Sequence, residues 1–201
     1  MWGDSMKKMA VLLYPDFTAL DAIGPLEVLG RIPEGEIHYV SLSGGPVVNK
    51  AGLTVMTESL SKIRDTYILL IPGGFGSRRV VKDRLFLEAI RESAGKSDFV
   101  LTVCTGSALA AAGLLDGKKA TSNKIAFDWA SSLGPKVLWD RDARWTKDGK
   151  YYTSGGVAAG IDMALGFAAD RLGREKALSI AEAMEYRWND NPEEGWCFRK
   201  K

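Results

Sequence analysis

Residues 99–108 read FVLTVCTGSA, and this stretch decides the fold prediction. Its first five residues form an apolar run that predicts a strand buried on both faces, which is typical of a parallel sheet covered by helices. Cys104 follows at once, and the small residues after it begin a helix. A buried strand, a sharp turn with a nucleophile and a helix form a nucleophile elbow. We therefore predict that Cys104 lies at the carboxyl edge of a sheet.

The rest of the chain continues the alternation of strands and helices. Strands are expected at 9–13, 37–42, 67–71 and 99–103, a hairpin over 46–56, short strands within 120–153, and helices at 20–29, 85–94, 105–115, within 120–133, at 157–172 and at 175–188. Pro25 fits the first helix only near its first turn. The pattern predicts an α/β fold, a three-layer sandwich on a mainly parallel sheet.

Length and composition indicate one globular domain. The chain has 201 residues, of which 46% are hydrophobic and 26% charged, so collagen-like and disordered proteins are excluded. No apolar run reaches the ~18 residues of a membrane span. The net charge of +2 gives no electrostatic case for nucleic acid. We expect a single domain over 1–201, with residues 1–6 as a disordered or cloning-derived extension, and neither nucleic acid nor membrane as partner.

The cysteine and histidine counts limit the chemistry. Cys104 and Cys197 form no CxxC motif, and no signal peptide is recognisable, so a cytoplasmic protein with reduced thiols is expected. His38 is the only histidine and falls in a predicted strand, so neither a multi-histidine zinc site nor histidine-dependent catalysis is expected. We expect no metal, and no chemical role for Cys197.

Three predicted strands end in unusual residues: Tyr14 onward, 72–74 (PGG) and 104–106 (CTG). Ligands of α/β folds bind outside the carboxyl ends of the strands, so these segments should meet in one crevice. The glycine-rich turn at 72–74 matches neither dinucleotide nor phosphate-loop spacing.

The residues around Cys104 predict an anion-stabilising turn. The helix N-terminus is expected to lower the pKa of the Cys104 thiol, and the Thr105 N–H, free in the first turn, can face a developing negative charge. Gly73 or Gly74 is expected to direct an N–H toward Cys104. The alternatives are a simple loop at the glycines and a cysteine that is only a small buried hydrophobe.

Two carboxyl groups are candidates for acid–base work. Asp21 is either the N-cap of its helix or a carboxyl group beside the sulfur, where it would retain its proton and act as an acid or proton shuttle. Glu27 either faces the same crevice or forms a surface salt bridge.

These junctions together resemble the ThiJ/PfpI superfamily, relatives of the class I glutamine amidotransferase domain. The resemblance rests on LDAIGP at 20–25 with Glu27 and Val28, IPGG at 71–74, VCTG at 103–106, AAGLLDGKKAT at 111–121 and TSGGVAAGID at 153–162. The combination is similar to isocyanide hydratases and to the ligand-binding domain of certain AraC-type regulators, although no helix-turn-helix pair follows here. The resemblance implies a flavodoxin-like fold, a homodimer and no cofactor.

The resemblance also implies roles for individual residues. Cys104 matches the nucleophile, Asp21 the carboxyl group that contacts it, Thr105 its neighbour and Gly74 the glycine on the oxyanion side. Many members carry a histidine where this chain has Asn123. Asparagine cannot act as a base, which argues against peptidase or amidase activity, and Asn123 is instead expected to hydrogen-bond a ligand.

The resulting hypothesis is a cysteine-dependent isocyanide hydratase, a lyase that converts a small isocyanide to an N-formamide through a covalent thioimidate. Two alternatives stay open. One is a glyoxalase or deglycase that acts on 2-oxoaldehydes, against which Asp21 and Asn123 argue. The other is a non-enzymatic sensor that binds a small molecule or responds to oxidation at Cys104.

Overall fold

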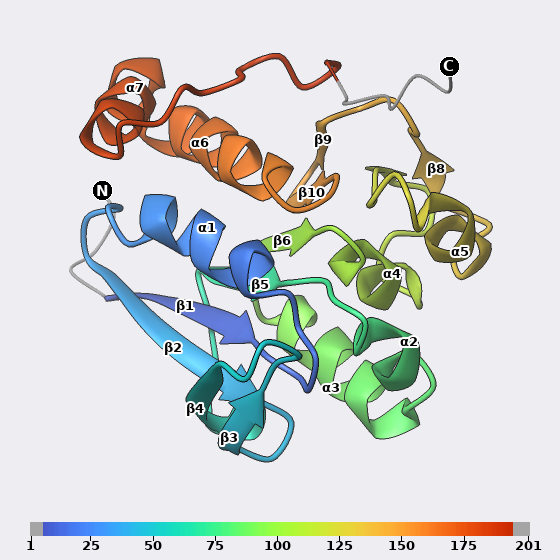
Figure 1. Cartoon of the computed structure of the whole chain (residues 1–201). Coiled ribbons are helices and arrows are strands. Elements are labelled where there is room, and N and C mark those ends of the chain that lie inside the picture. The colour runs from blue at the N-terminus through green and yellow to red at the C-terminus, as the bar shows by residue number, and fades with distance from the viewer. Residues whose placement is uncertain (1–5, 195–201) are drawn as a thin grey trace.

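The computed structural model describes residues 6–194, and its centre is a sheet of eight strands. The strands are β1 (Lys7–Leu12), β2 (Gly35–Ser41), β3 (Gly45–Val48), β4 (Thr54–Ser59), β5 (Ile68–Ile71), β6 (Phe99–Val103), β9 (Trp145–Asp148) and β10 (Tyr151–Ser154). They lie in the order β3-β4-β2-β1-β5-β6-β10-β9 (Figure 1). All pairs are parallel except those of the edge strands β3 and β9. The mainly parallel sheet is confirmed, and its central order is flavodoxin-like.

Helices cover both faces of this sheet, which confirms the three-layer sandwich (Figure 1). On one face lie α1 (Ala19–Leu29), α6 (Ala159–Leu172) and α7 (Arg174–Ala183). On the other lie α2 (Ser77–Val80), α3 (Arg84–Gly95), α4 (Gly106–Ala111) and α5 (Phe127–Ser132). A short 3-10 turn (Leu60–Lys62) follows β4, and β7 (Lys119–Ala120) pairs with β8 (Leu138–Trp139) outside the main sheet.

The central strands are buried on both faces, as their continuous apolar sequences predict. The four residues of β5 are at most 1% exposed, and Val100 to Val103 of β6 are 0% exposed. Ile71 pairs with Thr102 in the register of β5 and β6, so the carboxyl ends of these two strands lie almost level. The sheet thereby brings the turns that follow β5 and β6 to the same edge.

Several predicted helix limits differ from the structure. Pro25 lies inside α1 rather than in its first turn, and the helix continues past it. The helix after Cys104 ends at Ala111, and α7 ends at Ala183 because Glu185 takes a left-handed φ of 49°. The short helix α2 was not predicted.

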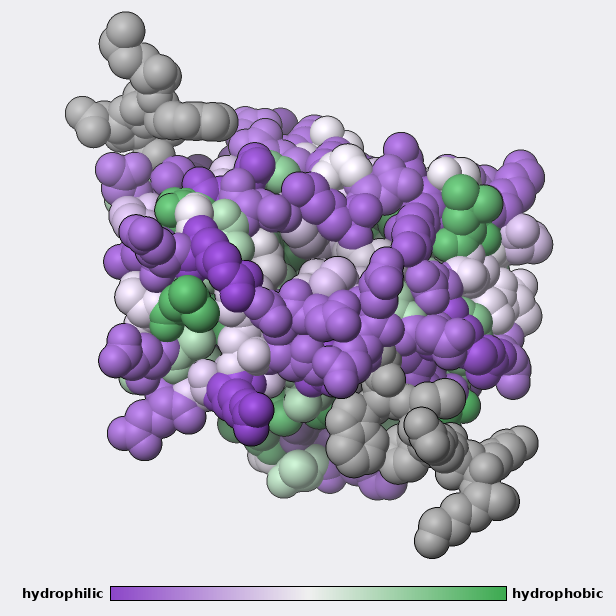
Figure 2. All heavy atoms as spheres, turned by 90° about the horizontal axis from the view of Figure 1, so that it is seen from above, coloured by the Kyte–Doolittle hydropathy of each residue, from purple (hydrophilic) through white to green (hydrophobic). Residues whose placement is uncertain are grey.

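The face over α6 and α7 is mainly hydrophilic, with separate small hydrophobic patches (Figure 2). None of the helices formed by residues 6–194 combines the length and the apolar character that crossing a bilayer needs. Predictions for residues 1–5 and for Cys197 lie outside the described part of the chain.

Candidate active site

The three strand-end segments meet in one place, as predicted. The Tyr14 hydroxyl, after β1, donates to the Pro72 carbonyl, after β5, at 2.6 Å. The Gly74 N–H donates to the Thr105 hydroxyl, after β6, at 2.9 Å. These hydrogen bonds join the ends of β1, β5 and β6 directly, so the convergence at the carboxyl edge is confirmed.

Cys104 sits at a strained turn between β6 and α4. Its φ is 58°, a left-handed conformation that costs a non-glycine residue on the order of 1–3 kcal/mol. Four residues hold both backbone groups of Cys104. Its N–H donates to the carbonyls of Ser154 at 3.2 Å and Gly155 at 3.1 Å, and its carbonyl accepts the hydroxyls of Ser107 at 3.1 Å and Ser122 at 3.0 Å. The predicted elbow is therefore present and fixed from both sides.

Gly106 explains how α4 can begin directly against β5. A Cβ at this position would lie 2.2 Å from the Ile71 carbonyl oxygen. Only glycine allows that approach, and the approach places the Cys104 side chain beside the end of β5.

Asp21 lies beside the sulfur rather than capping its helix. Thr18 is the N-cap of α1, and Asp21, fully buried, accepts the Gly73 N–H on Oδ2 at 3.1 Å. Oδ1 accepts no hydrogen bond from a nitrogen or oxygen of residues 6–194. Burial raises the pKa of Asp21 from 3.8 to about 7, although hydrogen bonds from Cys104 and Gly73 oppose the rise.

The predicted lowering of the Cys104 pKa is wrong in direction, because other effects outweigh that of the elbow. Burial, and next the charge of Asp21, raise the pKa of Cys104 from 9.0 to about 12. Hydrogen bonds from the Thr105 N–H and the Asn123 amide lower the pKa of Cys104. They do not outweigh the effect of burial, because the residue is only 6% exposed. The first proton of the pair is therefore lost from Asp21, and the sulfur keeps its own.

Asn123 is oriented as a donor. Its Oδ1 accepts the N–H groups of Ile125 at 3.0 Å and Ala126 at 2.9 Å. The side-chain oxygen is thereby occupied by backbone donors, so the amide NH₂ is the group that faces the Cys104 sulfur. Asn123 thus acts on the Cys104 sulfur as a hydrogen-bond donor that cannot accept its proton.

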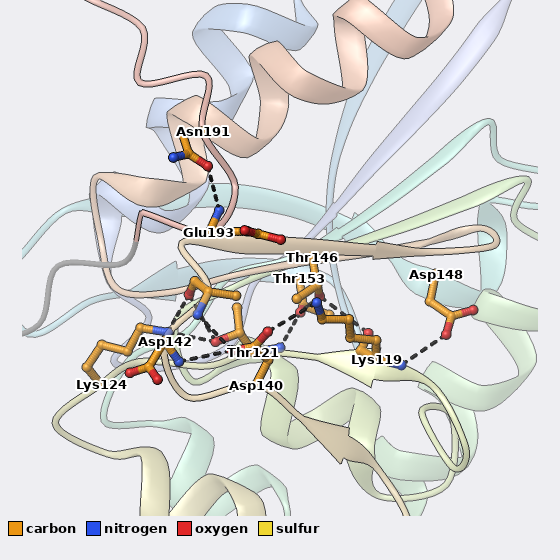
Figure 3. Close-up of polar contacts among 11 residues, drawn as sticks. Lys119, Thr121, Lys124, Asp140, Asp142, Thr146, Asp148, Thr153, Asn191 and Glu193 are labelled. Carbon is orange, nitrogen blue, oxygen red and sulfur yellow. Dashed lines mark hydrogen bonds and ion pairs between the residues drawn. The ribbon is translucent and has the colours of Figure 1, made fainter.

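The segment that carries Asn123 is anchored to the sheet through buried polar contacts (Figure 3). The Thr121 N–H donates to the Thr153 hydroxyl at 2.7 Å, and Thr153 shares a hydrogen bond with Thr146 at 2.8 Å. Lys124 donates to the Thr121 hydroxyl at 2.7 Å. Because β9 and β10 supply the two other threonines, the position of Asn123 is set by the sheet.

The N–H groups of the two glycines have partners inside the protein. That of Gly73 binds Asp21, and that of Gly74 binds the Thr105 hydroxyl, which also accepts the Ser77 hydroxyl at 3.1 Å. Their oxyanion role stays a prediction, and it requires a ligand to replace one of these contacts. The Thr105 N–H, by contrast, already points to the sulfur.

The remaining candidates lie away from this crevice. His38 is on β2, three strand positions from β6 and so roughly 14 Å away, and its Nδ1 contacts Glu58 at 3.0 Å. Glu27 is exposed and pairs with Arg31 at 3.1 Å. Residues 6–194 contain no cluster of three or more acidic, histidine or cysteine side chains that could hold a metal ion.

Sequence reasoning assigned no role to several residues that complete the site. The hydroxyls of Ser107 and Ser122 hold the Cys104 carbonyl. Burial, and next the charges of Asp21 and Cys104, raise the pKa of the Tyr14 phenol. Only the position of Tyr14 at a strand end, and of Ser107 in the CTGS stretch, gave a signal for them.

A buried cysteine on a strained elbow beside a buried carboxyl group, at the edge of a flavodoxin-like sheet, defines a class of cysteine-centred α/β proteins. Residues 7–170 match the model of the DJ-1/PfpI family, and the chain belongs to this family.

The relatives of this chain include an enzyme and regulators. It is 35% identical over 181 residues to the isonitrile hydratase of Pseudomonas putida. The aligned residues cover 89% of this chain and 78% of that protein. It is 30% identical over 178 residues to the HTH-type transcriptional regulator CdhR of Pseudomonas aeruginosa, covering 85% of this chain but only 52% of the regulator. Its fold is similar to that of a ThiJ/PfpI family protein from Pseudomonas syringae, with a TM-score of 0.82 and 31% sequence identity. The match covers 90% of this chain and 75% of that protein.

Proposed function

We propose that this protein hydrates an isocyanide to an N-formamide, with Cys104 as nucleophile and Asp21 as the group that moves protons. The buried hydrogen-bonded pair of Cys104 and Asp21 carries the proposal. The similarity to an isonitrile hydratase supports isocyanides as the substrate class. The chain's own residues supply a nucleophile and an acid–base group, which the reaction needs.

The first step joins the sulfur to the substrate. At pH values above about 7 the pair consists of a carboxylate and a thiol, because Asp21 has the lower pKa. Asp21 takes the S–H proton as the sulfur electron pair forms a bond to the terminal isocyanide carbon. Asp21 then gives this proton to the same carbon. The product is a thioimidate, R–N=CH–S–Cys104, and Asp21 is again a carboxylate.

The second step adds water and releases the product. Water oxygen bonds to the thioimidate carbon while the C=N electron pair moves to nitrogen, and Asp21 transfers one water proton to that nitrogen. Asp21 then takes the hydroxyl proton as the C=O bond forms and the C–S bond breaks. The sulfur leaves with its electron pair and regains the proton from Asp21. The sum is R–NC + H₂O → R–NH–CHO.

Hydrogen bonds to the sulfur favour the thiolate form of Cys104. The Thr105 N–H and the Asn123 amide both lower the pKa of Cys104, so they stabilise negative charge on the sulfur as it attacks and as it leaves. Asn123 supports this chemistry without competing with Asp21 for the proton.

A second candidate is a small-molecule sensor without turnover. The similarity to a transcriptional regulator over 85% of this chain favours it. A sensor would bind its ligand with Cys104 replaced by alanine, whereas a hydratase would lose product formation.

The test is turnover of p-nitrophenyl isocyanide to its formamide, followed by absorbance. We expect turnover by the wild type, its loss in Cys104→Ala and Asp21→Asn, and its retention in Glu27→Gln, which changes an exposed carboxyl group on the same helix. An inert wild type, or variants at Cys104 and Asp21 that keep full activity, would contradict the proposal.

A further inference from the structure

An open pocket of about 550 Å³ lies beside the proposed nucleophile. Its volume is typical of a small-molecule site. It is lined by Asn123, Lys124, Ile125, Arg144, Gly156, Val157, Ala158 and Ala159. Asn123 connects it to the reaction centre, because its amide contacts the Cys104 sulfur. Gly156 packs so closely on that amide that a Cβ there would lie 2.3 Å from Nδ2. Asn123 thus borders both the Cys104 sulfur and this pocket.

The lining of the pocket is rich in donors and poor in acceptors. Arg144 and Lys124 contribute cationic side chains, and no acidic residue lines it. The backbone N–H groups of Val157 and Ala158, just before α6, donate to no acceptor within residues 6–194. Apart from Asn123, the other side chains in the lining, Ile125 among them, are apolar. A ligand group with several acceptor atoms and negative charge fits this surface.

Arg144 is held in place from behind. Its Nε donates to Asp162 Oδ2 at 2.7 Å, and Nη2 binds the same oxygen. The other oxygen of Asp162 accepts the Asn189 N–H at 2.9 Å and the Tyr186 hydroxyl at 3.2 Å. Asp162 is fully buried and the Arg144 side chain is 12% exposed. The guanidinium also shares a hydrogen bond with the Tyr186 hydroxyl. Because a guanidinium carries five N–H donors, this planar group still has donors left for a carboxylate in the pocket.

We infer that this pocket binds an anionic group of the substrate, so that the preferred substrate is a small isocyanide carrying a carboxylate. The inference rests on the proposed hydratase function for the reacting end of the molecule. Arg144 and the N–H groups of the 157–158 turn bind the carboxylate, while the isocyanide carbon reaches Cys104.

The experiment compares isocyanoacetate with its uncharged methyl ester in the wild type and in two variants. Ala158 is exposed and occupies the N-cap of α6, where both aspartate and asparagine are favourable. Ala158→Asp adds a negative charge to the pocket, and Ala158→Asn is the uncharged control of the same shape. We expect the wild type to prefer the anion in kcat/KM, and the ratio of anion to ester to fall about tenfold in Ala158→Asp relative to Ala158→Asn, for like-charge repulsion near 1.4 kcal/mol.

Direct binding separates this inference from the hydratase proposal. Calorimetry on Cys104→Ala measures binding of N-formylglycine and of its methyl ester. Turnover of both isocyanides without preference for the anion overturns the anionic pocket and leaves the hydratase proposal standing. Absence of turnover, with N-formylglycine bound more tightly than its ester and weakened by Ala158→Asp, overturns the hydratase proposal and supports the pocket. Absence of both turnover and selective binding overturns both.

Discussion

The Asn123 amide donates a hydrogen bond to the Cys104 sulfur and lowers the pKa of this thiol. Backbone N–H groups of Ile125 and Ala126 occupy its oxygen, so the amide cannot turn around to accept a proton. The Asn123 amide is thus a fixed donor beside the sulfur, and the acidic member of the buried pair is Asp21, which has the lower pKa.

Replacing Asn123 with leucine should make the thiol less acidic. Leucine has a similar shape but no donor, and a hydrogen bond to a charged group contributes about 1.5–3 kcal/mol, which corresponds to a rise of about one to two units in the pKa of Cys104. The rate of alkylation by iodoacetamide across a pH series measures this change. Asn123→Asp keeps the acceptor for the two backbone N–H groups but adds a charge, and should slow alkylation more. Alkylation at the wild-type rate in Asn123→Leu would show that the amide does not act on the sulfur.

The pH dependence of turnover should follow Asp21. The base must be ionised before it can take the thiol proton, so kcat/KM for p-nitrophenyl isocyanide should rise with pH through an apparent pKa of about 7. Turnover measured from about pH 5 to 9 gives the profile. A flat profile, or one that rises only near the thiol pKa, would assign the base to another group.

The same carboxyl group should make the protein less stable at neutral pH. Its pKa is raised from 3.8 unfolded to about 7 folded, so the native state binds the proton more tightly. The contribution of this carboxyl group to the free energy of unfolding is fully present below about pH 4 and is lost as pH rises through 7. Its upper limit is roughly 4 kcal/mol. Asp21→Asn removes the charge and should raise the free energy of unfolding at pH 8 while it abolishes turnover. Urea unfolding at acidic and basic pH measures both effects, with Glu27→Gln as control, and a variant less stable than the wild type at pH 8 would refute this account.

The sequence predicted those features in which residue type reports local geometry. An apolar run such as 99–103 forms a strand because both faces of a parallel sheet are covered, and Gly106 marks a close approach because no side chain fits there. The meeting of Tyr14, 72–74 and Cys104 followed from the topology rule for strand ends.

The features that escaped prediction depend on contacts between distant segments. The rise in the pKa of Cys104 comes from burial and from Asp21 on another element, neither of which the local pattern of a helix N-terminus includes. Arg144 was missed because its position depends on Asp162 of α6. The early end of α7 follows from a left-handed turn at Glu185, which has no signature in residue type.

Ser107 and Ser122 should stabilise the elbow cooperatively. Each hydroxyl donates to the Cys104 carbonyl, so each single alanine variant should lower the free energy of unfolding by about 1 kcal/mol. The double variant removes both hydroxyl donors from a buried carbonyl, which adds about 1–3 kcal/mol beyond the sum. Urea unfolding of all four proteins measures this coupling. Ser179→Ala, which removes a similar hydroxyl contact at an exposed position of α7, is the control. Strict additivity would show that the two serines act independently.

The backbone strain at Cys104 gives a prediction that separates conformation from side-chain packing. At a φ of 58°, alanine in Cys104→Ala keeps the steric cost of the left-handed conformation, about 1–2 kcal/mol, and glycine in Cys104→Gly does not. Glycine also loses the packing of one methyl group, about 0.8 kcal/mol. We therefore expect Cys104→Gly to be more stable than Cys104→Ala by about 0.5 kcal/mol. At Ala108, inside helix α4, the change from alanine to glycine should instead cost about 1 kcal/mol or more. Chemical denaturation of the three variants measures these differences. If glycine destabilised both positions equally, the elbow would carry no strain, and the hydrogen bonds to Cys104 would not be needed to hold it.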